Sequence, residues 1–230
     1  MSIIHTRVPD FAIERAKSRR GGRLHAFESI NPRSTALLVV DMQNYFMQPT
    51  QAGEIDATRE IISNVNQLAA SMRASDGTIA WLRHTITEES EKRWPLWLNE
   101  LGSGEWSSRT REALLPGSQG HEIHQALDVE GGDLMIDKYC FSPFTEGSSD
   151  LHVRLRERGV DTLIITGVAT NACCESTARD GMMMNYRVHF VSDATACRTK
   201  EEQSATLAIV TVMFGDVRTT DQILQLLKQD

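Results

Sequence analysis

The sequence predicts an α/β fold in which helices cover both faces of a mainly parallel central sheet, a three-layer α/β/α arrangement. Short runs of β-branched and apolar residues, typical of strands buried on both faces, alternate along the chain with longer segments of helical periodicity. Such alternation implies βαβ units. Because ligands bind beyond the carboxyl ends of the strands in these sheets, residues that follow strands are the first candidates for a site.

The amino-acid composition limits the classes of protein to which the chain can belong. The chain has 230 residues, of which 40% are hydrophobic and 24% charged, which fits a soluble globular domain with a substantial core. Its formal net charge of −7 argues against nucleic acid and anionic membrane surfaces as partners. We find neither a signal-peptide pattern nor an apolar run of roughly 18 residues, the length needed to span a bilayer. The four cysteines lack CxxC spacing, which favours a reduced, cytoplasmic setting.

Residues 1–33 differ from the rest of the chain. They show no clear periodicity and contain Gly21 and Gly22 next to a basic cluster. The cluster consists of Arg15, Lys17, Arg19, Arg20 and Arg23. We expect an irregular N-terminal arm at 1–33 whose basic side chains are solvated, followed by a single domain at 34–230 without internal repeats.

The first half of this domain predicts two strands and one helix. A buried strand is expected at 35–40, a helix at 54–75 and a second strand at 78–82. The pattern weakens at 85–130, where Trp94, Trp97 and Trp106 lie among Pro, Gly, Ser and charged residues. This composition is typical of a long excursion that covers a pocket.

The second half continues the alternation of strands and helices. Strands are expected at 133–137, 162–166, 187–191 and 217–219, and helices at 148–158, 172–184, 201–214 and 220–228. Gly167 is expected to end the strand at 162–166, and Thr170 or Asn171 to cap the helix that follows it.

Cys173 carries the sharpest chemical signal in the chain. It is expected in the first turn of a helix, just beyond the carboxyl end of the strand at 162–166. A thiol placed there faces unpaired backbone N–H groups and the positive end of the helix dipole, both of which favour the nucleophilic thiolate. The same N–H groups are suited to hold the oxyanion of a tetrahedral intermediate.

Asp41, Lys138 and Cys173 all follow predicted strand ends and are therefore expected at one rim of the sheet, together with His84. A thiol that attacks an amide needs a base to take its proton and an acid to return a proton to the leaving nitrogen, and one carboxylate can do both. A neighbouring lysine stabilises the anionic forms. Taken singly, each residue also has a structural reading: a capping Asp, a surface ion-paired Lys and a packed Cys.

Three blocks of sequence resemble the signature blocks of the isochorismatase-like cysteine hydrolase superfamily. They read DMQNYF at 41–46, DKYCFSPF at 137–144 and GVATNACCESTARDG at 167–181, and the similarity extends over about 35–220. The resemblance implies a Rossmann-like fold and a catalytic triad of Asp41, Lys138 and Cys173. It also implies a cis peptide bond between Val168 and Ala169, with the oxyanion held by the backbone N–H groups of Ala169 and Cys173.

The branch that the third block resembles most contains ureidoacrylate and N-carbamoyl amidohydrolases. The resemblance therefore implies a hydrolase that acts on C–N bonds other than peptide bonds. Its substrate would be a small amide, ureide or carbamoyl compound, cleaved through a thioester or thiocarbamate on the enzyme. Alternatives are hydrolysis of a lactam or aryl amide, and a non-catalytic binding member of the family. A redox function of Cys173 with Cys174 is a third, although adjacent cysteines are unlike a CxxC pair. The family suggests a homodimer or homotetramer.

The residues around this triad give further expectations. Candidate substrate-binding residues are Asn44, Tyr45, His84, Trp94, Trp97, Tyr139 and Phe144. Cys174 is expected to pack in the core, whereas Cys140 either lines the pocket or fills space. Nicotinamidases in the superfamily bind a metal through an Asp-x-His-x-His cluster, but the segment around His84 reads WLRHTITEES, and His121 and His124 lack such a pattern. We therefore expect no metal and no other cofactor.

Overall fold

The centre of the molecule is a six-stranded sheet in which every recorded strand pair is parallel. The computed structural model describes residues 2–228, and the strands lie in the order β3-β2-β1-β4-β5-β6. Their bounds are β1 Thr35–Val40, β2 Thr78–His84, β3 Leu134–Lys138, β4 Thr162–Val168, β5 Arg187–Ala196 and β6 Asp216–Arg218. The prediction of a mainly parallel α/β sheet is thus confirmed, although β4 and β5 extend further than expected.

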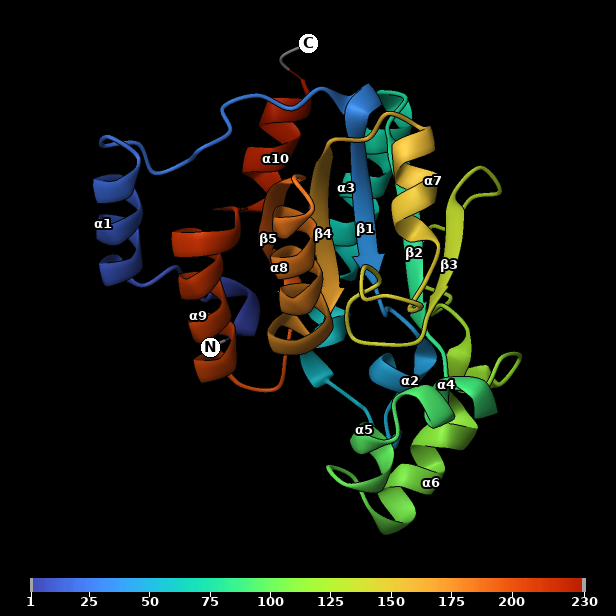
Figure 1. Cartoon of the computed structure of the whole chain (residues 1–230). Helices are drawn as coiled ribbons and strands as arrows, with labels where there is room; N and C mark the ends of the chain where they lie inside the picture. The colour runs from blue at the N-terminus through green and yellow to red at the C-terminus, as the bar shows by residue number, and fades with distance from the viewer. Residues whose placement is uncertain (1, 229–230) are drawn as a thin grey trace.

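Helices cover both faces of the sheet, which gives the predicted three layers (Figure 1). One face carries α3 (Ile62–Ala74) and α10 (Thr220–Leu227), whose apolar sides pack on residues such as Leu37, Ile79 and Ile164. The other face carries α7 (Leu151–Glu157), α8 (Glu175–Met183) and α9 (Lys200–Ile209). Within residues 2–228, no helix combines the length and apolar character needed to cross a membrane.

Shorter helical turns connect the elements. They are η1 Ile3–His5, η2 Pro32–Ser34, η3 Asp56–Glu60 and η4 Gln119–His121, together with two π-helical turns, η5 Thr170–Cys174 and η6 Val210–Phe214. The helix expected at 54–75 is therefore divided into η3 and α3. The helix expected at 172–184 is preceded by the π turn η5.

The excursion between β2 and β3 folds into short helices beyond the carboxyl ends of the strands, at the bottom of Figure 1. They are α4 Glu88–Arg93, α5 Leu96–Asn99 and α6 Gly104–Ala113, and α2 (Asn44–Met47) joins them from the segment after β1. Their small core contains Tyr45, Ile86, Leu98 and Leu114. The helices α4 and α5 are too short to show a hydrophobic period, and the buried residues of the longer α6 are the polar Ser107 and Thr110, so the sequence indicated only a loop.

Part of the N-terminal segment is helical, so the expectation of an irregular arm was wrong for that part, whereas residues 20–31 form no helix or strand. Residues Asp10–Arg19 form α1, in which Ala12 is fully buried and packs with Ala208 and Val212. A contact face made of alanine gives little hydrophobic contrast, which explains why periodicity did not reveal the helix.

Arg20 is also not a solvated basic residue. Its guanidinium lies 2.9 Å from Oδ1 of the buried Asp216, whose carboxylate also accepts the backbone N–H groups of Ala26 and Phe27. One carboxylate thereby ties the N-terminal segment to the edge strand β6.

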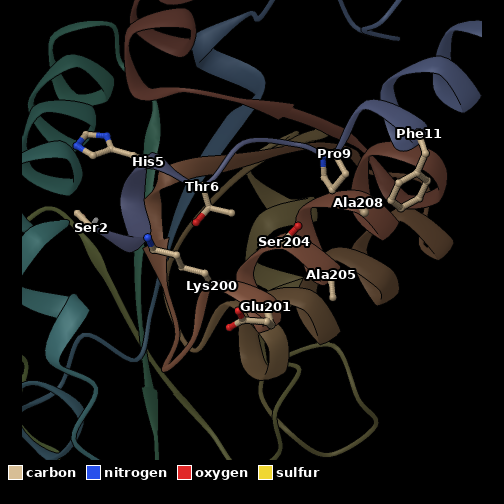
Figure 2. A pocket seen from close by; sticks show the side chains of 10 residues that line it. All are labelled: Ser2, His5, Thr6, Pro9, Phe11, Lys200, Glu201, Ser204, Ala205 and Ala208. Atoms are coloured by element: carbon tan, nitrogen blue, oxygen red, sulfur yellow. The ribbon is translucent and has the colours of Figure 1, made fainter.

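A groove of about 580 Å³ separates the N-terminal segment from α9 (Figure 2). Its lining residues are Ser2, His5, Thr6, Pro9, Phe11, Lys200, Glu201, Ser204, Ala205 and Ala208. None of the residues that line the groove comes directly after the carboxyl end of β1, β3 or β4. The groove is therefore separate from the candidate site described next.

Candidate active site

Asp41 lies where β1 ends, and the backbone around it is specialised. Asp41 has a left-handed φ of +51°, its N–H donates to Leu82 O of the neighbouring strand, and its side chain is fully buried. Next to it, Gly167 of β4 has a φ of +101°, and a Cβ there would collide with the backbone of Val40. Only glycine allows β4 to stay this close to the end of β1.

Lys138 brings the predicted residues together. It is the last residue of β3 and is paired with His84 of β2, so its side chain crosses the end of β2 to reach Asp41. Nζ lies 2.8 Å from Asp41 Oδ2 and 3.4 Å from Cys173 Sγ. It also lies 3.2 Å from His84 Nδ1 and 3.2 Å from the carbonyl oxygen of Cys140. The structure therefore gathers Asp41, Lys138 and Cys173 around one buried ammonium group.

Cys173 lies in the π turn η5, not in the first turn of an α-helix as expected. The turn follows a cis peptide bond between Val168 and Ala169, which confirms that part of the resemblance. The first residue before the turn is Ala169, with no side-chain cap, and its carbonyl accepts the N–H of Cys174 at 3.1 Å. Within residues 2–228, no backbone acceptor is recorded for the Ala169 N–H.

The electrostatics overturn the expectation of a resting thiolate. Burial raises the pKa of the Cys173 thiol, the Asp41 carboxylate raises it further, and Lys138 offsets only part of this effect. Burial also raises the pKa of Asp41 despite the attraction of Lys138. Although burial opposes the charge on Lys138, Asp41 and Cys173 outweigh it and raise the pKa of that amine. These shifts favour a charged amine on Lys138 and the thiol form of Cys173.

The donor atoms of Asp41, His84 and Cys173 lie within 4.8 Å of one another, as they would around a metal ion. The Lys138 ammonium contacts all three of these side chains. A charged amine of the protein thus already lies against all three donor side chains, which disfavours a metal ion at this cluster. His121 and His124 are engaged elsewhere: His121 Nε2 lies 2.7 Å from Thr85 Oγ1, and His124 Nδ1 accepts the N–H of Ala126.

An aromatic wall adjoins the triad through His84. It consists of His84, Trp94, Trp97 and Phe141. The centroid of Trp97 lies 4.9 Å from that of His84, and Trp94 stacks on Trp97 at 5.3 Å. Phe141 meets Trp94 edge to face at 4.8 Å. Sequence reasoning selected three of these side chains and missed Phe141, although it lies in the DKYCFSPF block.

Four predicted pocket residues do not belong to this wall, and the side chains of three of them have other partners. Tyr45 is 1% exposed and its hydroxyl pairs with Thr110, so it fastens the excursion to the sheet. The Asn44 amide donates to Gln119 O, and Phe144 stacks on Tyr186. The Tyr139 side chain is half-buried, and the recorded hydrogen bond of this residue runs from its backbone N–H to Ser148 O.

Gln43 is a site residue that sequence reasoning missed. It is fully buried, accepts the His84 N–H at 2.7 Å and donates to the carbonyls of His84 and His121. Its position within DMQNYF was the available signal. Gln43 thereby fixes the backbone of His84 against the loop after β1.

The aromatic wall borders a cleft of about 530 Å³. The cleft is lined by Arg93, Trp94, Cys140, Phe141, Ser142, Thr145, Glu146, Ser176, Arg179, Asp180 and Met183. Cys140 thus lines the cleft while its carbonyl contacts Lys138. Cys174 is fully buried with its sulfur 3.7 Å from Thr166 O, as the packing prediction required.

Comparisons with known proteins show the family of this chain. Residues 35–222 match the family described as the isochorismatase domain. A ureidoacrylate amidohydrolase of Methylobacterium radiotolerans is 32% identical over 81% of this chain and 77% of its own length. Nicotinamidase 3 of Arabidopsis thaliana is 32% identical over 80% of this chain and 83% of its own length.

Solved structures show the same relationship. The crystal structure of a cysteine hydrolase from Pseudomonas syringae pv. phaseolicola matches with a TM-score of 0.75 and 30% identity, over 88% of this chain and 96% of that one. The matched region contains the whole sheet and every member of the Asp41–Lys138–Cys173 cluster. The chain therefore belongs to the isochorismatase-like cysteine hydrolase family.

Proposed function

We propose that this protein is a cysteine-dependent amidohydrolase that cleaves a C–N bond, other than a peptide bond, in a small amide, ureido or carbamoyl compound. One observation carries the proposal: a thiol and a carboxylate lie on either side of one buried ammonium, at 3.4 and 2.8 Å from its nitrogen. This arrangement pairs a nucleophile with a base and keeps the net charge of the group balanced.

The proposed acylation step follows from the charge balance of the site. Asp41 takes the thiol proton of Cys173, so the negative charge moves from the carboxylate to sulfur while Lys138 stays protonated. Sulfur then attacks the substrate carbonyl carbon. As the C–N bond breaks, the proton on Asp41 leaves with the nitrogen as an amine or ammonia. A thioester or thiocarbamate remains on Cys173.

Deacylation uses the same residues in reverse. The ionised Asp41 removes a proton from a water molecule, and the resulting hydroxide adds to the carbonyl of the intermediate. The C–S bond breaks, and Cys173 recovers its proton from Asp41. We assign the oxyanion in both steps to the backbone N–H groups of Ala169, which directly precedes the turn η5 and follows the cis bond, and of Cys173, which lies within that turn.

Two substrate classes are favoured by different observations. A ureido or carbamoyl compound is favoured by the similarity to the ureidoacrylate amidohydrolase. A planar aryl amide or lactam is favoured by the aromatic wall of His84, Trp94, Trp97 and Phe141. The intact triad argues against a purely binding role. The burial of Cys174, whose sulfur approaches Thr166 O, argues against a dithiol redox role.

The test is hydrolysis of a panel of ureido acids, carbamoyl amino acids, aryl amides and lactams. Ammonia release is measured for the first three classes, and ring opening of the lactams by mass spectrometry. Wild type and Cys173→Ala are compared throughout. Turnover of one class by wild type alone supports the proposal. Equal turnover by both proteins contradicts it, as does an inactive wild type whose Cys173 also resists alkylation.

A further inference from the structure

The Lys138 ammonium fixes the hydrogen position on His84. His84 Nδ1 lies 3.2 Å from Lys138 Nζ, which is always a donor while the amine is charged. Nδ1 must therefore accept, and the single proton of the neutral ring is on Nε2. Burial and the charge of Lys138 lower the pKa of His84 well below its ordinary value, and the nearby His121 lowers it further, so the ring is neutral.

The Nε2–H of His84 has no partner within the described part of the chain. The Lys138 contact is the only recorded hydrogen bond of the His84 side chain. His84 as a whole is 1% exposed, yet its Nε2 is not among the sealed, unpaired polar atoms of residues 2–228. The small accessible area of His84 therefore includes Nε2. A nearly buried donor that lacks a protein acceptor needs an acceptor from another molecule.

The ring that carries this donor is held rigidly. Gln43 bonds both the N–H and the carbonyl of His84, and Trp97 packs edge to face on the ring. Trp94 and Phe141 of the same wall also line the cleft of about 530 Å³. The ring that carries the donor is consequently held beside the triad and against the aromatic wall.

We propose that His84 is a specificity-determining residue whose Nε2–H binds an acceptor oxygen of the substrate, distinct from the carbonyl that Cys173 attacks. The inference rests on the proposed function and adds a requirement to it. The substrate carries a second carbonyl or a carboxylate oxygen, and Lys138 serves two purposes by orienting both the triad and this donor. Compounds that lack the second oxygen leave Nε2 unpaired in a dry site and are rejected.

The test uses ligands that differ only at the second oxygen, namely 3-ureidopropionate, 3-ureidopropanamide and n-propylurea. Dissociation constants are measured by calorimetry in the Cys173→Ala background, so that turnover is not required. Three second substitutions separate the two nitrogens of the ring. His84→Gln retains a donor at the Nε2 position, His84→Asn retains an acceptor at the Nδ1 position, and His84→Phe retains only the aromatic packing.

We expect His84→Phe and His84→Asn to weaken 3-ureidopropionate binding at least about tenfold, because a hydrogen bond to a charged acceptor is lost. His84→Gln should stay within about threefold of the parent. Binding of n-propylurea should change less than about threefold in all variants. The carboxylate of 3-ureidopropionate could instead be attracted to Arg93, which lines the cleft. The neutral 3-ureidopropanamide separates the two explanations. If His84 donates a hydrogen bond, the His84 substitutions should weaken binding of the carboxamide too, whereas attraction to Arg93 predicts no such loss.

Three results would overturn the inference. The first is a loss of n-propylurea affinity equal to the loss of 3-ureidopropionate affinity, and the second is a His84→Gln variant that binds 3-ureidopropionate as weakly as His84→Phe. The third is that none of the three ligands binds. Failure of the proposed function gives a different result. If the acceptor-bearing ligands bind with the predicted dependence on His84 but wild type hydrolyses nothing, the binding inference stands and the hydrolytic assignment falls.

Discussion

Lys138 Nζ lies 2.8 Å from Asp41 Oδ2, and neither side chain has any exposed surface. Removing both charges from water costs much of the free energy that their attraction provides. The pair therefore matters less for the stability of the fold than for the charge that it places beside Cys173. Here it raises the pKa of Lys138, keeps that amine charged, and places the charge 3.4 Å from Cys173 Sγ.

Breaking the pair should cost stability as well as activity. Asp41→Asn leaves the Lys138 charge uncompensated, and we expect the free energy of unfolding to fall by about 3–5 kcal/mol. Asp41→Asn combined with Lys138→Met removes both charges and should recover at least half of that loss, without recovering turnover. Urea denaturation of wild type, the single and the double variant measures this. An Asp41→Asn protein as stable as wild type would contradict the buried ion pair.

The pH dependence of turnover should report the Asp41–Cys173 pair. Burial raises the pKa of Asp41, and the carboxyl must be deprotonated to accept the thiol proton. Accordingly, kcat/KM should fall as the pH is lowered, with a midpoint above the value of about 4 of an ordinary aspartate. A pH–rate profile, with circular dichroism to confirm folding at each pH, gives the midpoint. A profile that stays flat down to about pH 4 would contradict this role of Asp41.

The aromatic wall should affect substrate binding more than chemistry. Trp94 stacks on Trp97, packs against Phe141 and lines the cleft, so Trp94→Leu should raise KM about 3- to 30-fold with little change in kcat. Trp106→Leu is the matched control, because Trp106 contacts Trp97 but is 37% exposed and does not line the cleft. Steady-state kinetics distinguish the two. Equal effects of both substitutions would show that the excursion acts only as a structural unit.

Asp216 should hold the N-terminal segment on the sheet. Its buried carboxylate accepts from Arg20, Ala26 and Phe27, so Asp216→Ala leaves a guanidinium and two N–H groups without their acceptor. We expect a loss of about 3–5 kcal/mol in unfolding free energy and faster proteolysis near residues 20–27. Arg15→Ala, at an exposed position on α1, is the control. Unchanged proteolysis in Asp216→Ala would refute this attachment.

The sequence predicted the parts of the molecule that depend on local pattern. Runs such as TALLVV and the glycines that follow helices located the strands, and parallel pairing then placed Asp41, Lys138 and Cys173 at one edge. The helix α1 escaped prediction because its buried face is formed by alanines. In the excursion, α4 and α5 have too few residues to show a repeating apolar pattern, and α6 was missed because its buried residues are the polar Ser107 and Thr110.

The chemistry of the site depends on distances that no sequence pattern contains. The neighbourhood of Cys173 suggested a thiolate, but the three-dimensional approach of Asp41 and the loss of water around sulfur favour the thiol. The role of Gln43 depends on two hydrogen bonds between its side-chain amide and the backbone of His84, which only the folded structure brings together. The oligomeric state and the roles of the triad residues stay predictions.

The central claim is that Cys173 becomes covalently acylated during hydrolysis. The most direct measurement is mass spectrometry of the peptide containing Cys173, after acid quenching of the wild-type enzyme during turnover of the best substrate of the panel. We predict a mass increase at Cys173 equal to the acyl or carbamoyl part of the substrate, and its absence from Asp41→Asn treated identically. Turnover that continues in Cys173→Ala, with no adduct on the wild-type peptide, would contradict the account.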